Sequence, residues 1–94
     1  MVVWTLPARD DLKNIYHFIA EDSVYFAVEV SEKIIDISKQ LIHFPLQGRQ
    51  VPELKNAAFR EVFVYSYRLI YEIKNQTIYV IALVHMKKKF KGIK

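Results

Sequence analysis

The sequence predicts an α+β fold, in which an antiparallel pair of helices packs on one face of a mainly antiparallel sheet. Three features of the chain support this prediction. A short apolar run comes first, two stretches with helical spacing of apolar residues follow, and three segments rich in Val, Ile, Tyr and Phe come last. Of the 94 residues, 52% are hydrophobic and 14% aromatic, so we expect one packed domain over residues 1–94.

The first expected elements are a strand and a helix. Val2–Leu6 is a short apolar run closed by Pro7, which is typical of a strand. Pro7 also lies near a helix start, where its missing N–H does no harm. Apolar residues recur with helical spacing in Ala8–Ala20, and this predicts an amphipathic helix. These residues are Leu12, Ile15, Tyr16 and Ile19.

A second helix is predicted after a short link. Asp22 or Ser23 is suited to cap its first turn, and Pro45 stops it. Because only a few residues join the two helices, we expect an antiparallel hairpin. The apolar stripe of the second helix consists of Phe26, Val30, Ile34, Ile37 and Leu41, with Phe44 near its end.

The rest of the chain is predicted to be mostly sheet. Leu46–Asn56 is the loosest stretch because it holds Gly48 and Pro52, and it contains one short strand around Arg49–Val51. The polar segment Lys74–Thr77 is the expected turn between the last two strands. The three longer strands are predicted at Phe59–Tyr65, Tyr67–Ile73 and Ile78–His85.

Charge is divided unevenly along the chain. Residues 1–44 hold four basic and seven acidic side chains, a net charge of −3, whereas residues 45–94 hold ten basic and three acidic ones, a net charge of +7. A basic half favours an anionic partner, which is RNA, DNA or an acidic protein. The alternative is a lysine-rich tail that serves solubility. Five basic residues lie in the last eight positions: Lys87, Lys88, Lys89, Lys91 and Lys94.

The composition also indicates the cellular compartment in which the protein is expected. The chain has no cysteine, so disulfides and thiolate metal sites are excluded. No apolar run reaches the roughly 20 residues that span a bilayer. Arg9, Asp10 and Asp11 follow the first apolar run, unlike a signal peptide. We therefore expect a cytoplasmic protein without a membrane partner.

Pairing of the last two strands predicts which side chains share a face. If Asn75 and Gln76 form the loop, uniform pairing places Arg68 opposite Leu83, with His85 as its diagonal neighbour. Arg68 and His85 should then point together, away from the helices. The more apolar face, expected to meet the helices, holds Tyr67, Leu69, Tyr71, Ile73, Ile78, Val80, Ala82, Val84 and Met86.

An arginine and a histidine on one exposed face suit phosphate chemistry. Arg68 would hold a phosphodiester, and His85 would transfer a proton near neutral pH. Cleavage of RNA through its 2′-hydroxyl also requires a base, and Glu53 is a candidate. The alternative is an ordinary surface arginine with a structurally bonded histidine.

Several segments together resemble the toxins of the RelE/ParE superfamily. They are PLQGRQVPEL (Pro45–Leu54), FREVFVYSYRLIYEI (Phe59–Ile73) and IYVIALVH (Ile78–His85), after an early pattern of Trp4, Ala8, Asp11, Leu12, Ile15, Phe18 and Ile19. The resemblance covers nearly the whole chain. It implies the strand–helix–helix–strands order and the toxin role in a type II toxin–antitoxin pair, with a cognate antitoxin as partner.

One branch of the superfamily cleaves mRNA on the ribosome, and this is the first functional interpretation. By similarity to its YoeB-like members, Glu53 is the base, Arg68 the phosphate ligand and His85 the acid. Further phosphate contacts are assigned to Arg60, Lys55, Arg49 and Lys87. The chain departs from YoeB-like toxins at its end, where Met86 and a lysine tail replace a terminal tyrosine.

The other branch, the ParE type, poisons DNA gyrase and has no nuclease site. The same segments are as common there, and the local match is the closer one. In that interpretation Glu53 and Arg60 pair within the sheet edge and loop. An inactive relative that only binds its antitoxin is the third hypothesis. None of the three implies a cofactor or metal. His17 and His43 match no motif and are expected on the surface, in the predicted helices.

Overall fold

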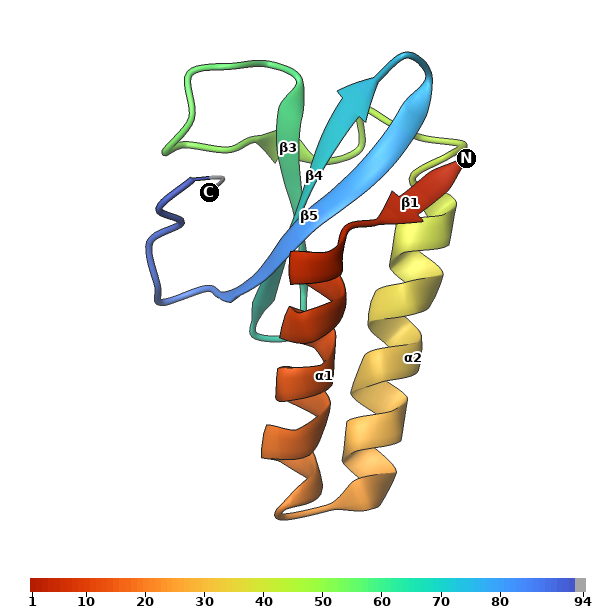
Figure 1. Cartoon of the computed structure of the whole chain (residues 1–94), viewed down its shortest axis with the longest axis vertical. Helices are drawn as coiled ribbons and strands as arrows, with labels where there is room; N and C mark the ends of the chain where they lie inside the picture. Colours follow the sequence, from red (N-terminus) through yellow and green to blue (C-terminus); the bar gives the residue numbers. More distant parts are fainter. Residues whose placement is uncertain (93–94) are drawn as a thin grey trace.

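A computed structural model shows a twisted five-stranded sheet with a helical hairpin against one face (Figure 1). The structure describes residues 1–92. The strand order is β1-β5-β4-β3-β2, with β1 parallel to β5 and all other pairs antiparallel, so the predicted α+β fold is confirmed. The elements are β1 (Val2–Trp4), α1 (Leu6–Ala20), α2 (Val24–Gln40), β2 (Arg49–Gln50), β3 (Phe59–Val64), β4 (Tyr67–Lys74) and β5 (Thr77–His85).

Short hydroxyl side chains set the start of both helices. The Thr5 Oγ1 accepts a hydrogen bond from the Ala8 N–H at 3.3 Å and donates one to the Val80 carbonyl of β5 at 2.9 Å. Thr5 therefore ends β1 at Trp4 and starts α1 two residues earlier than expected. Ser23 caps α2, as predicted, by accepting a bond from the Phe26 N–H at 3.2 Å. Such a cap contributes about 1 kcal/mol.

The hairpin reaches beyond the sheet, and this changes the expected burial of α2. Figure 1 shows the linked ends of α1 and α2 extending past the strands. Phe26 lies in the first turn of α2 and is 56% exposed, and Phe44, after the end of the helix, is 66% exposed. Both were expected in the buried stripe. In residues 1–92 no helix is long and apolar enough to cross a membrane.

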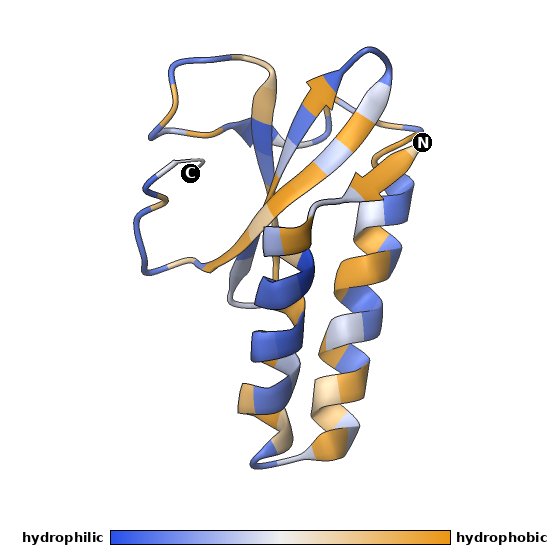
Figure 2. Ribbon diagram, viewed as in Figure 1, coloured by the Kyte–Doolittle hydropathy of each residue, from blue (hydrophilic) through white to orange (hydrophobic). Residues whose placement is uncertain are grey.

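The main core lies between the hairpin and the sheet. Figure 2 shows β5 as mostly apolar and the segment after it as mostly polar. Val30 and Ile37 of α2 pack at the margin of this core, as the predicted stripe requires. Its buried members are Ala8, Ile34, Leu41, Val62, Val64, Leu69, Tyr71, Ile78, Val80 and Leu83.

A smaller cluster covers the opposite face of the sheet. After β5 the chain folds back over this face, and Phe90 packs there with only 9% of its surface exposed. Without Phe90, this apolar part of the sheet would face water. The cluster consists of Val51, Ile70, Ile81, Ala82 and Phe90.

A β-bulge in β5 overturns the expected facing of its second half. Lys74 pairs with Thr77 as predicted, and the uniform register holds as far as Tyr71 and Val80. Ile70 then pairs with Ala82, so Ile81 is an extra residue. Ala82 accordingly joins the Phe90 cluster, and Leu83 enters the helix-covered core instead.

The loop before β2 is attached to β4 through Tyr71. Its hydroxyl donates to the Pro45 carbonyl at 2.7 Å and accepts from the Gly48 N–H at 3.0 Å. A Cβ at Gly48 would lie 2.5 Å from the Glu61 carbonyl oxygen and 2.7 Å from the Tyr71 hydroxyl. Glycine is therefore required here, and this close approach brings Arg49 beside Glu61.

Candidate functional site

The charged centre of the molecule is an arginine enclosed by two glutamates. Arg68 Nη1 and Nη2 donate to the two carboxylate oxygens of Glu53 at 2.8 and 2.7 Å, which is a bidentate pair. Its Nε donates to Glu61 Oε1 at 2.8 Å, and Nη2 lies 2.7 Å from the same oxygen. Arg68 Nη1 also donates to the Lys88 carbonyl at 3.2 Å. Every nitrogen of the guanidinium is therefore engaged.

Strand register explains how these groups meet. Phe63 pairs with Arg68 and Glu61 pairs with Ile70, so Glu61 and Arg68 share the face opposite the helices. Glu53 comes from the loop after β2, close behind the buried Val51. Glu61 is 1% exposed and Arg68 is 5% exposed. A carboxylate so buried requires a cation beside it.

The ion pair between Arg68 and Glu53 shifts the pKa values of both side chains. The hydrogen bonds from Arg68 lower the pKa of Glu53 from 4.5 to about 2, with a further contribution from the Phe90 N–H, which donates to Glu53 at 2.8 Å. The bonds to Glu53 in turn raise the pKa of Arg68 above its ordinary value. Glu53 is therefore a fixed anion near neutral pH, whose oxygens already accept three hydrogen bonds.

The third expected member of the site, His85, lies on the other face of the sheet. The bulge pairs His85 with Tyr67, on the side of the helices, so the expectation that Arg68 and His85 point together was wrong. His85 stacks edge-on against Tyr67 with ring centres 5.7 Å apart, and its Nδ1 accepts from the Lys87 N–H at 3.2 Å. It lines a hollow with Asp11 and Phe18 of α1. Glu53 and Arg68 are together, and His85 is apart from them.

Comparison with known proteins decides the family. A sequence model for the ParE toxin of the type II toxin–antitoxin system parDE matches residues 2–90. The chain belongs to this family. No curated protein sequence gives a match to the toxin.

Solved structures of toxin–antitoxin systems share the fold of the toxin. The chromosomal ParDE system from P. aeruginosa superposes with a TM-score of 0.73 at 21% identity, covering 89% of this chain and 92% of that one. The RelBE2 complex from Mycobacterium tuberculosis gives 0.56 at 25% identity, with 90% and 95% covered. The YoeB–YefM complex from Staphylococcus aureus gives 0.58 at 13% identity, with 90% and 94% covered.

The remaining expected site residues of the toxin separate into two groups. Arg49 and Lys87 line one hollow together with Glu53 and Arg68. Arg60 pairs with Tyr71 on the helix side, and its Nη1 donates to the Gly48 carbonyl at 2.8 Å, so it neither adjoins Arg68 nor pairs with Glu53. Lys55 is exposed in the loop after β2.

The other expected surface residues follow the fold. His17 on α1 and His43 are both exposed, although His43 lies in the turn after α2 instead of in the helix. Lys94, counted among the tail lysines, lies outside the described residues.

Glu61 is the member of this charged cluster that sequence reasoning missed. It accepts hydrogen bonds from Arg68 and from Arg49, whose Nε donates to Glu61 Oε2 at 2.6 Å. The signal in the sequence was an acidic residue within the apolar strand segment Phe59–Val64, since a charge in such a strand requires a partner. Pairing it with Arg68 would have required the β3–β4 register.

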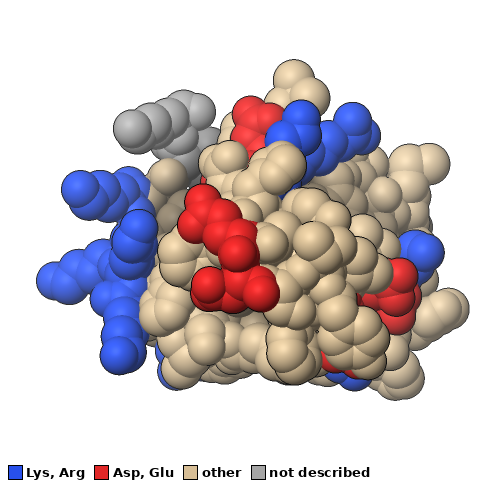
Figure 3. Space-filling model, turned by 90° about the horizontal axis from the view of Figure 1, so that it is seen from below, with Lys and Arg blue, Asp and Glu red and all other residues tan. Residues whose placement is uncertain are grey.

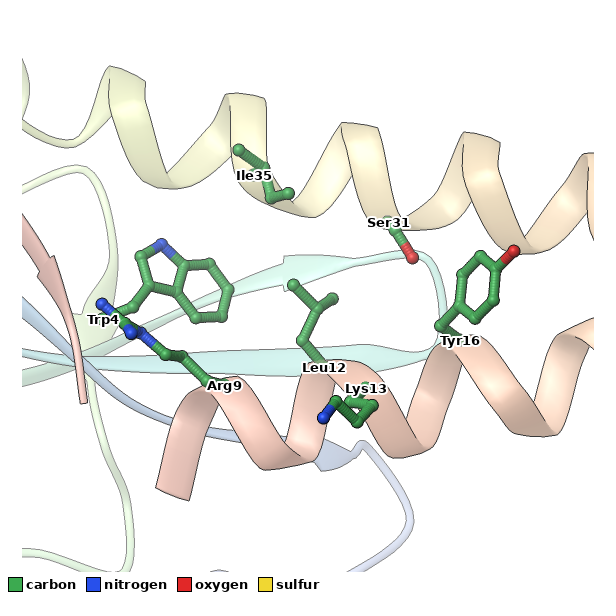
Figure 4. Close-up of a pocket in the computed structure, with 7 residues that line it drawn as sticks. All are labelled: Trp4, Arg9, Leu12, Lys13, Tyr16, Ser31 and Ile35. Carbon is green, nitrogen blue, oxygen red and sulfur yellow. The ribbon is translucent and has the colours of Figure 1, made fainter. Parts of the chain in front are cut away.

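The toxin also has an apolar groove between its two helices (Figure 4). The groove has a volume of about 480 Å³ and receives the Trp4, Leu12, Tyr16 and Ile35 side chains, while Arg9 and Lys13 rise from α1 at its rim. The Trp4 Nε1 donates to Ser38 Oγ of α2 at 3.2 Å, which fixes the indole at one end. The Ser31 hydroxyl in the groove is buried and has no hydrogen-bond partner in residues 1–92.

Proposed function

We propose that this toxin inhibits growth by binding DNA gyrase, and that it does not cleave mRNA. The observation that carries this proposal is the enclosure of Arg68 by Glu53 and Glu61. A phosphate ligand needs free donors directed toward the substrate, and the guanidinium of Arg68 has already given its donors to protein oxygens. The resemblance to the gyrase-poisoning branch, and the membership in the ParE family, point the same way.

The other two residues of the expected nuclease site also support a non-enzymatic role. A general base works best with a pKa near the working pH, whereas the pKa of Glu53 is lowered to about 2. An acid for the leaving oxygen must lie near the phosphate, whereas His85 lies on the opposite face of the sheet from Arg68. The Glu53–Arg68 pair and His85 therefore lie on opposite faces of the sheet, which favours a structural role for all three.

We also propose an antitoxin as the partner, bound in the groove between α1 and α2 in the cytoplasm. The titles of the three similar structures name toxin–antitoxin systems or complexes. An amphipathic helix would place apolar side chains against Leu12 and Tyr16. Acidic residues at its edge would meet Arg9 and Lys13, so the charge of the rim favours an acidic segment. Growth should recover when the cognate antitoxin is co-expressed.

The test compares gyrase and mRNA directly. The toxin is induced without antitoxin, mRNA ends are mapped by primer extension, and gyrase–DNA cleavage complexes are measured on supercoiled plasmid. We expect linear plasmid to accumulate with gyrase and mRNA to stay intact. His85→Ala should retain toxicity because its ring lies apart from Arg68, and His17→Ala on exposed α1 is the matched control.

Two results would contradict the proposal. New mRNA ends that are lost in His85→Ala but retained in His17→Ala would establish the nuclease interpretation instead. Harmless expression of a folded toxin would indicate the inactive relative.

A further inference from the structure

A second arginine beside the enclosed one is held in place but keeps free donors. Arg49 Nε donates to Glu61 Oε2 at 2.6 Å, and its guanidinium carbon lies 5.1 Å from the centre of the Phe63 ring. These contacts fix the plane of the guanidinium, while 60% of the side chain stays exposed. Its two Nη groups donate to no acceptor among residues 1–92. Arg49 is therefore a pre-positioned anion ligand, in contrast to Arg68.

Lysines of the C-terminal segment lie next to this arginine. Lys87, Lys88 and Lys89 line the same hollow of about 440 Å³ as Arg49, and all three are exposed. Throughout the described part of the chain, no lysine forms a salt bridge. Figure 3 shows blue side chains gathered along the left side of the view, with red ones toward its centre.

The backbone that carries these lysines is anchored. The Lys88 N–H donates to the His85 carbonyl at 2.8 Å, and the Lys88 carbonyl accepts from Arg68. The Phe90 N–H donates to Glu53, and its ring is buried on the sheet. Binding an anion there needs little ordering of the backbone, because the Arg68–Glu53 pair already holds the segment.

Phosphate is the anion that this surface fits best. Lysine ammonium groups are point charges that neutralise phosphates without reading sequence, and a guanidinium with two free Nη groups binds a phosphate through both. Among residues 1–92, Glu53 is the one carboxylate that lines this hollow, and Arg68 neutralises it. For an acidic protein segment the toxin already offers the apolar groove between α1 and α2, with Arg9 and Lys13 at its rim.

We propose that Arg49, Lys87, Lys88 and Lys89 form a surface that contacts the phosphate backbone of duplex DNA. This inference rests on the proposed function, because gyrase holds duplex DNA where the toxin would act. The surface contributes sequence-independent affinity for the gyrase–DNA complex, and the remaining contacts are made with the enzyme.

Binding of the full chain to DNA tests the surface. A fluorescent 25-base-pair duplex of arbitrary sequence is titrated with toxin at NaCl concentrations from 50 to 200 mM, and anisotropy is recorded. Replacing Lys87, Lys88 and Lys89 by Gln should weaken binding at least tenfold at 50 mM. It should also reduce the slope of log K against log salt by about 2 to 3, since each phosphate contact contributes about 0.9. Arg49→Gln alone should reduce the slope by about 1.

A matched variant distinguishes the effect of this surface on DNA affinity from the effect of net charge. Replacing Lys33, Lys39 and Lys74 by Gln removes the same charge from exposed positions on α2 and at the end of β4, and the affinity of this variant for the duplex should stay within threefold of the wild type. An equal loss in both triple variants would overturn the proposal. So would tighter binding to a 25-nucleotide RNA strand or to a poly-glutamate peptide than to the duplex.

The gyrase assay keeps this inference distinct from the proposed function. If wild-type toxin traps gyrase on DNA and the Lys87/Lys88/Lys89→Gln variant traps it equally at 150 mM NaCl, the DNA surface is refuted and the gyrase proposal stands. If wild-type toxin leaves gyrase unaffected but binds duplex through these lysines, the gyrase proposal is refuted. In that case the lysine surface binds duplex DNA, but its proposed contribution to affinity for the gyrase–DNA complex is refuted as well.

Discussion

The two faces of the sheet are covered in different ways. The helix side is closed by apolar residues such as Leu69, Tyr71 and Val80, which are fully buried under the hairpin. The other side is closed by a folded-back segment that is held by Phe90 and by the ion pairs of Arg68. The stability of the helix-covered face depends on buried apolar area, whereas the stability of the other face depends on the charge of its ion pairs. Substitutions and changes of pH should therefore distinguish the two faces.

The largest effect is expected from Arg68→Ala. It leaves the carboxylate of Glu61 buried without its main cation, and such a loss costs about 3 to 5 kcal/mol of unfolding free energy. Leu69→Ala, the neighbour on the helix side, should cost about 3 kcal/mol. Urea denaturation at pH 7 measures both.

A charge-free replacement shows whether Arg68 matters through its charge. Combining Arg68→Met with Glu53→Gln and Glu61→Gln should recover most of the stability lost in Arg68→Ala, because buried ion pairs are often replaceable by neutral groups. A loss below about 1 kcal/mol in Arg68→Ala would show that the ion pairs do not hold this face.

Lowering the pH should destabilise the face that carries the Glu53–Arg68 ion pair before it affects the helix-covered face. The pKa of Glu53 is lowered from 4.5 to about 2 in the folded chain, so its contribution is present above pH 4.5 and is lost as pH falls toward 2. Unfolding free energy, followed by urea denaturation from pH 6 to pH 2.5, should therefore decline. Glu53→Gln should be less stable at pH 6 and show a shallower decline. Parallel curves for wild type and Glu53→Gln would refute this assignment.

Removing the Phe90 ring should act locally. Phe90→Ala is expected to lower global stability by about 1 kcal/mol, since the segment after β5 can detach without opening the core. Hydrogen exchange of the Phe90 amide, which donates to Glu53, should accelerate strongly. Exchange in the helix-covered strands should hardly change, and a uniform acceleration of all amides would contradict the separation of the two faces.

The smallest effect is expected at the turn that joins β4 and β5, where neither face is involved. Asn75 and Gln76 both have positive φ, 51° and 62°, a conformation that suits Asn-Gly. Gln76→Gly should raise the unfolding free energy by about 0.5 to 1 kcal/mol in a thermal or urea melt. A decrease would show that the Gln76 side chain makes a contact that glycine cannot replace.

Sequence patterns predicted the elements well because helices and strands leave periodic traces. Leu12 and Ile15 marked one helix, Ile34 and Ile37 the other, and the β-branched and aromatic residues of Tyr67–Ile73 marked β4. The Glu53–Arg68 proximity was also expected, although as a catalytic site. The predicted facing of His85 was wrong. It depended on the pairing of β4 with β5, and no residue pattern marks Ile81 as a bulge.

The chemistry of the site was harder to predict than its location. Whether an arginine is free or enclosed depends on its neighbours in space, and the second partner of Arg68, Glu61, lies on another strand. Phe90 and Lys88 complete the enclosure from a segment whose path has no periodic signal. The sequence showed cations in this half of the chain, but not which of them keep free donors.

The bulge at Ile81 makes strand length, and not residue identity, the determinant of where His85 lies. Side chains alternate between faces along a strand, so one additional residue reverses the facing of all residues after it. Inserting a residue between Leu83 and His85 would move the imidazole to the face of Arg68 and leave the first half of β5 unchanged. A change of one codon in length would thus redistribute polar groups between the two faces, so that new chemistry could arise without replacing any existing residue.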